Sequence, residues 1–226
     1  MTSHGFFVTG TDTGIGKTVI ACALLYAFAV AGFKVVGMKP VAAGAEPGAH
    51  GLVHDDVERL VSGSNIAAPR ELVNPYCFRP AIAPHIAAAQ EGVVIDLARI
   101  ERNFRALAGL ADAVVVEGVG GFRVPLGPRT DIAQLAGQLE LPVILVVGMR
   151  LGCLNHALLT ADAIAAQGLR FAGWIANHVD PDMAVADQNV ETLEARLPAR
   201  LIARVPFTPA PTSDAIGPLL AQVIPR

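Results

Sequence analysis

The chain has 226 residues, of which 53% are hydrophobic and 16% are charged, and its formal net charge is −3. A chain of this length forms one large α/β domain or two small ones, and its apolar content supplies a core covered on both faces. The small negative charge, with no run of lysine or arginine, gives no electrostatic footprint for nucleic acid.

The sequence argues against a membrane span and a secretory signal. The longest apolar stretch, residues 19–33, has fifteen residues, fewer than the about 18–20 that cross a bilayer. The opening residues MTSHGFF have neither a basic n-region nor a long apolar h-region. Cys22, Cys77 and Cys153 are odd in number and far apart, which is typical of a reduced compartment. We therefore expect a cytoplasmic protein without a membrane partner.

Six short apolar runs are rich in valine and isoleucine and do not alternate with polar residues: GFFVTG, KVVGMK, DAVVVEG, PVILVVG, FAGWIAN and RLIARVP. Such runs are typical of strands in a parallel sheet with both faces covered. Helical spacing is found between them, at residues 19–31, 97–108, 131–139, 155–167 and 185–197. Gly32, Gly109 and Gly168 are predicted to end three of these helices as left-handed caps.

This alternation predicts a single doubly wound α/β domain over residues 1–226, with a mostly parallel sheet and helices on both faces. Ligands bind such sheets at the carboxyl ends of the strands. Residues 40–89 are less regular and contain six of the sixteen prolines. We interpret them as an excursion from the sheet edge that lines a site, and not as a separate domain.

The first strand and the first helix are joined by the loop GTDTGIGKT, residues 10–18. A phosphate loop needs small residues whose N–H groups turn toward an anion, and a helix must begin directly afterwards. Common phosphate loops have four residues between the first glycine and the Gly-Lys pair, whereas five separate Gly10 from Gly16. We predict a P-loop NTPase in which Lys17 reaches the β- and γ-phosphates and Thr18 ligates Mg²⁺. The alternative is a strand-to-helix turn with a solvated lysine.

Charged residues at other predicted strand ends would complete a phosphoryl-transfer site. Glu117 ends a buried run and precedes the glycine-rich loop 118–121, and we favour a metal-binding role over a turn cap. Lys39 ends the second run, where it either faces the same crevice or is solvated. Asp55 and Asp56 open a short helix, and from the residues alone at least one of them is interpreted as its N-terminal cap.

Seven motifs occur in the order VTGTDTGIGKT, KPVAAG, VNPYCF, APHIAAAQEG, VVVEGVGG, LPVILVVGMRLGCLNHALLTA and GWIAN. Together they resemble the ATP-dependent dethiobiotin synthetases of biotin biosynthesis, over residues 6–206. That family carries the longer loop G-T-D-T-x-V-G-K-T, which accounts for the additional loop residue. The resemblance implies a homodimeric, Mg²⁺-dependent ligase with its site near the subunit interface.

The implied reaction converts 7,8-diaminopelargonic acid, CO₂ and ATP into dethiobiotin, ADP and phosphate. One amine captures CO₂ as a carbamate, which attacks the γ-phosphate to give a carbamic–phosphoric anhydride. The second amine then closes the ureido ring and expels phosphate. Carbamate and triphosphate are both anions, so bringing them together requires cations, here Lys17, Lys39 and Mg²⁺.

The resemblance also implies roles for individual residues. Lys17 and Lys39 would be catalytic, and the metal ligands would be Thr18, Asp56 and Glu117. The nucleotide, which is ATP with other triphosphates as alternatives, would be bound by Thr13, Gly14, Ile15, Gly16, Lys17, Thr18, Val19, Asp56, Glu117, Gly118, Val119, Gly120, Asn177, His178, Pro206, Phe207 and Thr208. The substrate would contact Thr13, Lys39, Ala43, Gly152, Cys153, Leu154 and Asn155.

Within these sets, Asn177 matches the residue that reads the base. The helix beginning near Cys153 would receive the substrate carboxylate, which agrees with helix-end electrostatics. Cys153 is interpreted as a small residue and not a nucleophile, and His85 and His156 as structural.

Four positions depart from the family pattern. Gly14 and Ala43 replace a common glutamate and serine, and Asn189 replaces a tyrosine that reaches the site from the partner subunit. Ser213 stands where relatives have the acidic residue that helps to recognise adenine.

Two other classes of P-loop protein were weighed against the synthetase. Partition ATPases of the Min or Par type carry a second lysine early in the loop, near Asp12 in this sequence, and often a basic amphipathic membrane helix. The C-terminal stretch SDAIGPLLAQVIPR is neither basic nor strongly amphipathic. Cobyrinate-type synthetases need an additional glutaminase domain, for which 226 residues leave no room.

Overall fold

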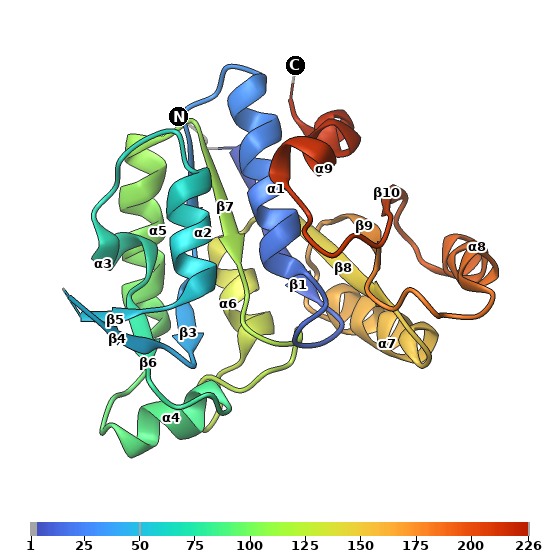
Figure 1. Cartoon of the computed structure of the whole chain (residues 1–226). Coiled ribbons are helices and arrows are strands. Elements are labelled where there is room, and N and C mark those ends of the chain that lie inside the picture. The colour runs from blue at the N-terminus through green and yellow to red at the C-terminus, as the bar shows by residue number, and fades with distance from the viewer. Residues whose placement is uncertain (1–3, 50, 226) are drawn as a thin grey trace.

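The computed structural model describes residues 4–49 and 51–225. Its central sheet has six strands in the order β10-β9-β8-β1-β7-β2, all parallel (Figure 1). The strands are β1 (His4–Gly10), β2 (Val35–Met38), β7 (Ala113–Glu117), β8 (Val143–Met149), β9 (Phe171–His178) and β10 (Leu201–Val205). No helix in the described ranges has the length and apolar character that a bilayer crossing requires.

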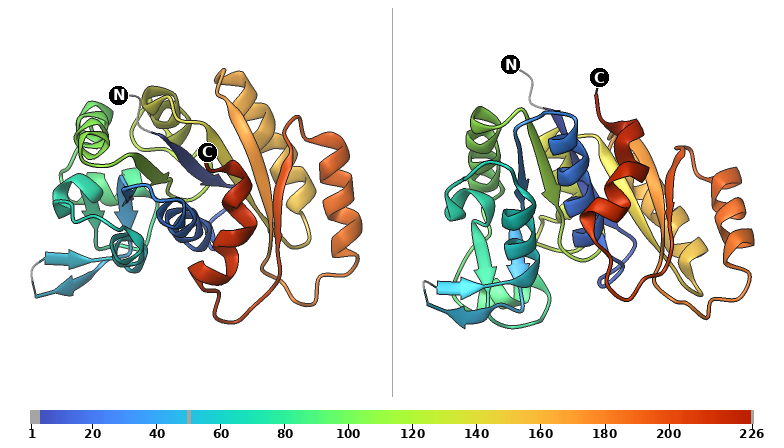
Figure 2. Two further views of the ribbon diagram at one scale, coloured as in Figure 1. Left: turned by 90° about the horizontal axis from the view of Figure 1, so that it is seen from above. Right: turned by 45° about the horizontal axis from the view of Figure 1, so that its top comes forward.

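Helices cover both faces of this sheet (Figure 2). One face carries α1 (Lys17–Val30), α9 (Ser213–Leu220) and part of α2 (Asp55–Gly63). The other face carries α5 (Leu97–Leu110), α6 (Ile132–Leu139), α7 (Cys153–Ala166) and α8 (Ala186–Arg196). A short 3₁₀ helix, η1 (Ala221–Val223), follows α9. The predicted doubly wound α/β class is confirmed.

The continuous apolar runs are explained by two hydrophobic cores, one on each side of the sheet. On β7, Val114 and Val116 pack into one core, while Ala113 and Val115 pack into the other. Successive side chains of a strand point to opposite faces, so a strand covered on both sides must be apolar at every position.

Residues 40–89 form the irregular segment, which borders the carboxyl ends of the strands. It contains two small pairs of strands: the parallel pair β3 (Val41–Ala43) and β6 (Tyr76–Phe78), and the antiparallel hairpin of β4 (Glu46–Gly48) and β5 (Gly51–Val53). Its helices are α2, α3 (Arg70–Val73) and α4 (Pro84–Gln90), the last of which extends to residue 90. Val41, Val73, Tyr76 and Phe78 are buried in the same core as Met38 of β2. The segment therefore packs against the sheet that it leaves.

Each of the six strands and five helices predicted above lies within two residues of its predicted bounds. Gly32 and Gly168 have the expected left-handed backbone, with φ of 89° and 66°. The prediction for Gly109 is wrong, because α5 continues through Leu110. The N–H of Ala111 donates to the carbonyl of Leu107 and the chain then becomes extended, so this helix ends without a left-handed residue.

The interpretation of Asp55 or Asp56 as the cap of α2 is also wrong. His54 is the capping residue, since its Nδ1 accepts a hydrogen bond from the N–H of Asp56 at 3.2 Å. The carboxylate of Asp56 is thereby left for contacts with other elements.

Candidate active site

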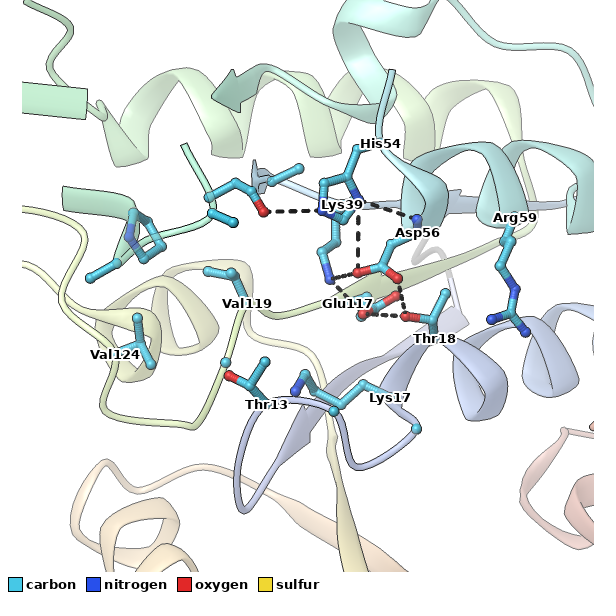
Figure 3. Close-up of a pocket in the computed structure, with 18 of the residues that line it drawn as sticks. Thr13, Lys17, Thr18, Lys39, His54, Asp56, Arg59, Glu117, Val119 and Val124 are labelled. Carbon is cyan, nitrogen blue, oxygen red and sulfur yellow. Dashed lines mark hydrogen bonds and ion pairs between the residues drawn. The ribbon is translucent and has the colours of Figure 1, made fainter. Parts of the chain in front are cut away.

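A cavity of about 780 Å³ opens at the carboxyl ends of β1, β2 and β7 (Figure 3). This volume is in the range of small-molecule sites. Twelve residues predicted above to bind nucleotide or substrate line it: Thr13, Gly14, Gly16, Lys17, Thr18, Val19, Lys39, Ala43, Asp56, Glu117, Val119 and Gly120.

The loop between β1 and α1 is folded tightly by its glycines. Gly14 and Gly16 have positive φ, 73° and 89°, and a Cβ at Gly16 would lie 2.2 Å from Nδ2 of Asn177. That amide donates to the carbonyl of Ile15 at 2.8 Å. Gly16 caps α1 without a side chain, so the N–H groups of the first turn face the cavity and favour an anion.

Lys17 is the first residue of α1 and is only 6% exposed. Its Nζ donates to the carbonyl of Asp12 at 2.6 Å. Burial, and after it the positive charge of Lys39, lowers the pKa of Lys17 to about 8. An anionic ligand at the loop would reverse this shift, because a nearby negative charge favours the protonated amine.

Lys39 follows β2 and is 3% exposed, so it faces the cavity and is not solvated. Its Nζ donates to Oε1 of Glu117 at 2.5 Å, to Oδ2 of Asp56 at 2.9 Å and to the carbonyl of Gly118 at 3.3 Å. Thr18 joins the same network, because its Oγ1 lies 2.7 Å from Oδ1 of Asp56 and 2.9 Å from Oε1 of Glu117. Four side chains from β7, α1, α2 and the end of β2 thus meet at one point.

The charges in this network stabilise one another. Burial alone would lower the pKa of Lys39, but the carboxylates of Glu117 and Asp56 raise it above its usual value. Burial alone would raise the pKa of Asp56, but the Lys39 ammonium and the Thr18 hydroxyl lower it. Lys39 therefore stays protonated and Asp56 ionised at neutral pH.

The network has unfilled capacity for a cation. Oε2 of Glu117 is buried without a hydrogen-bond partner among the described residues. Thr18 has one hydroxyl hydrogen for two carboxylate oxygens, so one of these contacts brings two oxygens together without a proton. No group of three or more His, Cys, Asp or Glu side chains in the described ranges could hold a metal. Mg²⁺ is nevertheless suited to this set, because it takes one or two carboxylates and completes its shell with phosphate oxygens and water.

Several predicted site residues lie outside the cavity. The side chain of Ile15 is in the core beside the loop, and Gly118 contributes its carbonyl to Lys39. The residues expected near the base end β9 or follow β10, and they do not border the cavity: Asn177, His178, Pro206, Phe207 and Thr208. The residues expected to receive the substrate carboxylate begin α7, after β8, and do not border it either: Gly152, Cys153, Leu154 and Asn155.

An ion pair connects the loop with the start of α7. The guanidinium of Arg150, just before α7, forms an ion pair with the carboxylate of Asp12, the position where partition ATPases would carry a lysine. Burial raises the pKa of the Cys153 thiol, so this thiol stays protonated at neutral pH.

Some lining residues were not predicted from the sequence, namely His54, Arg59, Val124 and the turn 81–84 before and at the start of α4. Arg59 could have been predicted, because it follows Asp56 by three residues on α2 and therefore lies on the same face of that helix as Asp56. No pattern in the sequence indicated the turn 81–84, since its position beside the cavity depends on how residues 40–89 fold back over the strand ends.

Comparisons with known proteins support one family. A family model described as an AAA domain matches residues 4–214. The chain is 57% identical over 203 residues to the ATP-dependent dethiobiotin synthetase BioD of Aromatoleum aromaticum, covering 90% of each chain. It is 55% identical to the same enzyme of Nitrosospira multiformis, over 90% of this chain and 88% of that one. A third BioD, from Janthinobacterium sp. (strain Marseille), is 52% identical over 95% and 92% of the two chains.

Solved structures share the fold at low sequence identity. The cell division protein MinD of Aquifex aeolicus superposes with a TM-score of 0.57 at 16% identity, covering 98% of this chain and 87% of that one. A ParA family ATPase of Chlorobium tepidum gives the same score at 12% identity, covering 98% and 97%. These similarities concern the fold alone, and they confirm its P-loop NTPase type.

Proposed function

The chain belongs to the ATP-dependent dethiobiotin synthetases, and from this premise we propose how its own residues carry out the reaction. It is a ligase of biotin biosynthesis that uses ATP to form carbon–nitrogen bonds, joining 7,8-diaminopelargonic acid and CO₂ into dethiobiotin. The observation that carries the proposed mechanism is the contact of Lys39 with Glu117 and Asp56 beside the phosphate loop.

The loop and Lys17 bind the triphosphate in this proposal. The uncapped first turn of α1 and the backbone of residues 13–19 offer N–H groups to the phosphates. Lys17, whose pKa is lowered to about 8 in the absence of an anion, recovers full protonation when the β- and γ-phosphates approach it. The loop thus gives an affinity that does not depend on the base.

Lys39 stabilises the reacting anions. Its ammonium is buried between β2 and β7 and remains charged, and together with Lys17 it lines the cavity that the γ-phosphate would enter. A preorganised cation reduces the repulsion between the carbamate and the phosphoryl group that it attacks. The substrate amine that bears the carbamate would lie near Thr13 and Ala43, which line the same cavity.

Thr18, Asp56 and Glu117 would hold Mg²⁺. The unpartnered Oε2 of Glu117 and the shared Thr18 hydroxyl support this set. When bound, the ion neutralises charge that develops on the β- and γ-phosphates.

The substrate carboxylate requires a second subunit in this proposal. Residues 152–155 lie at the start of α7, outside the cavity that contains Lys39. We therefore place the carboxylate site for each cavity on the partner of a homodimer. The test mixes subunits that carry Lys39→Ala with subunits that carry Asn155→Ala. If each site combines Lys39 of one subunit with Asn155 of the other, one of the two sites in a mixed dimer has both natural residues, and activity should return. No recovery would place both residues in one subunit.

The base would contact Asn177, His178 and the segment Pro206, Phe207 and Thr208, although the Asn177 amide already supports Ile15. We also propose that residues 1–226 act as one domain, because buried residues of 40–89 belong to the sheet core. The unpaired Cys22, Cys77 and Cys153 support a cytoplasmic location for it.

The direct test supplies the diamino acid, bicarbonate, Mg²⁺ and ATP and measures dethiobiotin by mass. Product should form with ATP and disappear in the Lys17→Ala variant. Lys34→Ala, which changes an exposed lysine before β2, should keep full activity. ATP hydrolysis without product would instead favour a switching ATPase.

A further inference from the structure

Arg59 is a charged residue of the cavity that the mechanism above does not use. It lies on α2, one turn after Asp56, and is exposed. Its guanidinium has no hydrogen bond or ion pair with any described residue. In Figure 3 its side chain extends from α2 toward the first turn of α1, beside Thr18.

A second observation places the same guanidinium over α1. Arg59 borders not only the main cavity but also a groove between α1, α2 and the start of α9, together with Cys22, Tyr26 and Ser213. Burial raises the pKa of the Cys22 thiol to about 11, and the nearby charge of Arg59 acts in the opposite direction. The guanidinium therefore lies near the first two turns of α1, where Thr18 and Cys22 are found.

The other cations of the cavity already have partners. Lys39 is paired with Asp56 and Glu117, and Lys17 donates to the Asp12 carbonyl. These two lysines balance the two carboxylates, so Arg59 adds an uncompensated positive charge to the lining. A triphosphate brings more negative charge than this balanced set can neutralise.

The path of the triphosphate leads toward this charge. If the γ-phosphate lies near Lys39, the chain of phosphates follows the loop to the N-terminus of α1, where Thr18 and Val19 line the cavity. The phosphate next to the sugar then lies over this first turn, within reach of α2. A guanidinium offers a planar fork of donors that matches two phosphate oxygens.

We propose that Arg59 binds the sugar-proximal phosphate of the nucleotide and so contributes affinity that is independent of the base. This rests on the proposed function in one respect, that a nucleoside triphosphate occupies the loop. It deepens that function, because Ser213 lacks the carboxylate that would help to recognise adenine. Arg59 would replace part of this affinity with a contact to phosphate.

The test compares Arg59→Gln, Arg59→Lys and the wild type by calorimetric titration with ATP, CTP and inorganic tripolyphosphate in the presence of Mg²⁺. Arg170→Gln is the matched control, because Arg170 is exposed at the opposite end of the sheet. Loss of a charge-assisted hydrogen bond should weaken all three ligands about tenfold in Arg59→Gln. Arg59→Lys should recover part of the affinity, and Arg170→Gln should match the wild type. Turnover at saturating ATP should change little, while KM for ATP rises.

Two results would overturn the proposal. In the first, Arg59→Gln binds every ligand as tightly as the wild type. In the second, it weakens ATP and spares CTP and tripolyphosphate, so that Arg59 acts on the base. Failure of the proposed function has a different signature: the wild type would bind nucleotide without forming dethiobiotin, and the comparison of variants would still decide the role of Arg59.

Discussion

Replacing Lys39 by methionine tests the centre of the proposed mechanism. Methionine keeps most of the side-chain volume and removes the ammonium that contacts Glu117 at 2.5 Å and Asp56 at 2.9 Å. Removing one preorganised donor to a developing charge costs about 10²–10³ in turnover, or about 2.7–4 kcal/mol. We expect a fall of at least about 10²-fold, with a much smaller change in nucleotide affinity, because Lys17 and the loop N–H groups remain.

The same substitution affects stability, and the experiment must separate the two effects. Glu117 is 1% exposed and would lose its cation, and breaking a buried pair costs about 3–5 kcal/mol of unfolding free energy. The double variant Lys39→Met/Glu117→Gln removes both charges, so it should regain part of that stability. It should not regain turnover, because the cation is still missing. Mg²⁺ should stabilise the single variant more than the double one, since only the single variant keeps both carboxylates.

The assay measures dethiobiotin formation at saturating substrates, ATP affinity by calorimetry and unfolding by denaturant. Lys34→Met is the control, because Lys34 is exposed next to the other end of β2. Near-normal turnover in a folded Lys39→Met protein would refute the catalytic role. Parallel loss of turnover and ATP affinity would mean that Lys39 only holds the site together.

Three further outcomes are expected. The pKa of Lys17 is about 8 and a bound triphosphate raises it, so MgATP binding should take up a proton above pH 8 and its affinity should fall by up to about tenfold per pH unit. Calorimetry in buffers of different ionisation enthalpy measures the proton uptake. Constant affinity above pH 8 would contradict the prediction. A methyl ester of the diamino acid should bind far more weakly than the acid, and Asn155→Ala should weaken the acid while leaving ATP binding intact; equal affinity for acid and ester would remove α7 from the site. CTP, GTP and UTP should bind within about tenfold of ATP, or about 1.4 kcal/mol, because Ser213 provides no carboxylate; in a competitive titration, a far larger preference would show that Asp214 or another group reads adenine.

The sequence predicted the fold well because its signals are local. Strands buried on both faces are apolar along their length, and β7 and β8 follow this rule except at Glu117, the last residue of β7, which enters the site. The phosphate loop is equally local, since its glycines, lysine and threonine are consecutive. Gly109 was misjudged because a glycine before a strand does not determine where the helix ends, and Ala111 closes α5 without a left-handed turn.

The network around Lys39 was only partly predictable, since it joins residues that are distant in the sequence. Thr18 contacts Asp56 over a separation of 38 residues and Glu117 over 99. The strand-end rule pointed to Lys39 and Glu117, but no local pattern showed that His54 caps α2. With the cap supplied by His54, Asp56 is held in the network by Thr18 and Lys39. The distance of residues 152–155 from the cavity is likewise a property of the folded chain.

The charge balance of the cavity explains how Lys39 and Lys17 take different roles. Without a ligand, Lys39 is bound to two carboxylates, and it is the carboxylates that keep it protonated in spite of burial. A divalent cation held by Asp56 and Glu117 would draw on the same two carboxylates and weaken their hold on the ammonium. The positive charge of Lys39 would then be directed to the reacting phosphoryl group when the nucleotide and metal are both present. Lys17, whose pKa is lowered to about 8, is already mostly protonated at neutral pH, and the arriving phosphates raise that pKa and keep it charged at higher pH as well. In the free protein the carboxylates of Asp56 and Glu117 offset the charge of Lys39, and in the loaded enzyme that charge becomes available to the phosphoryl group.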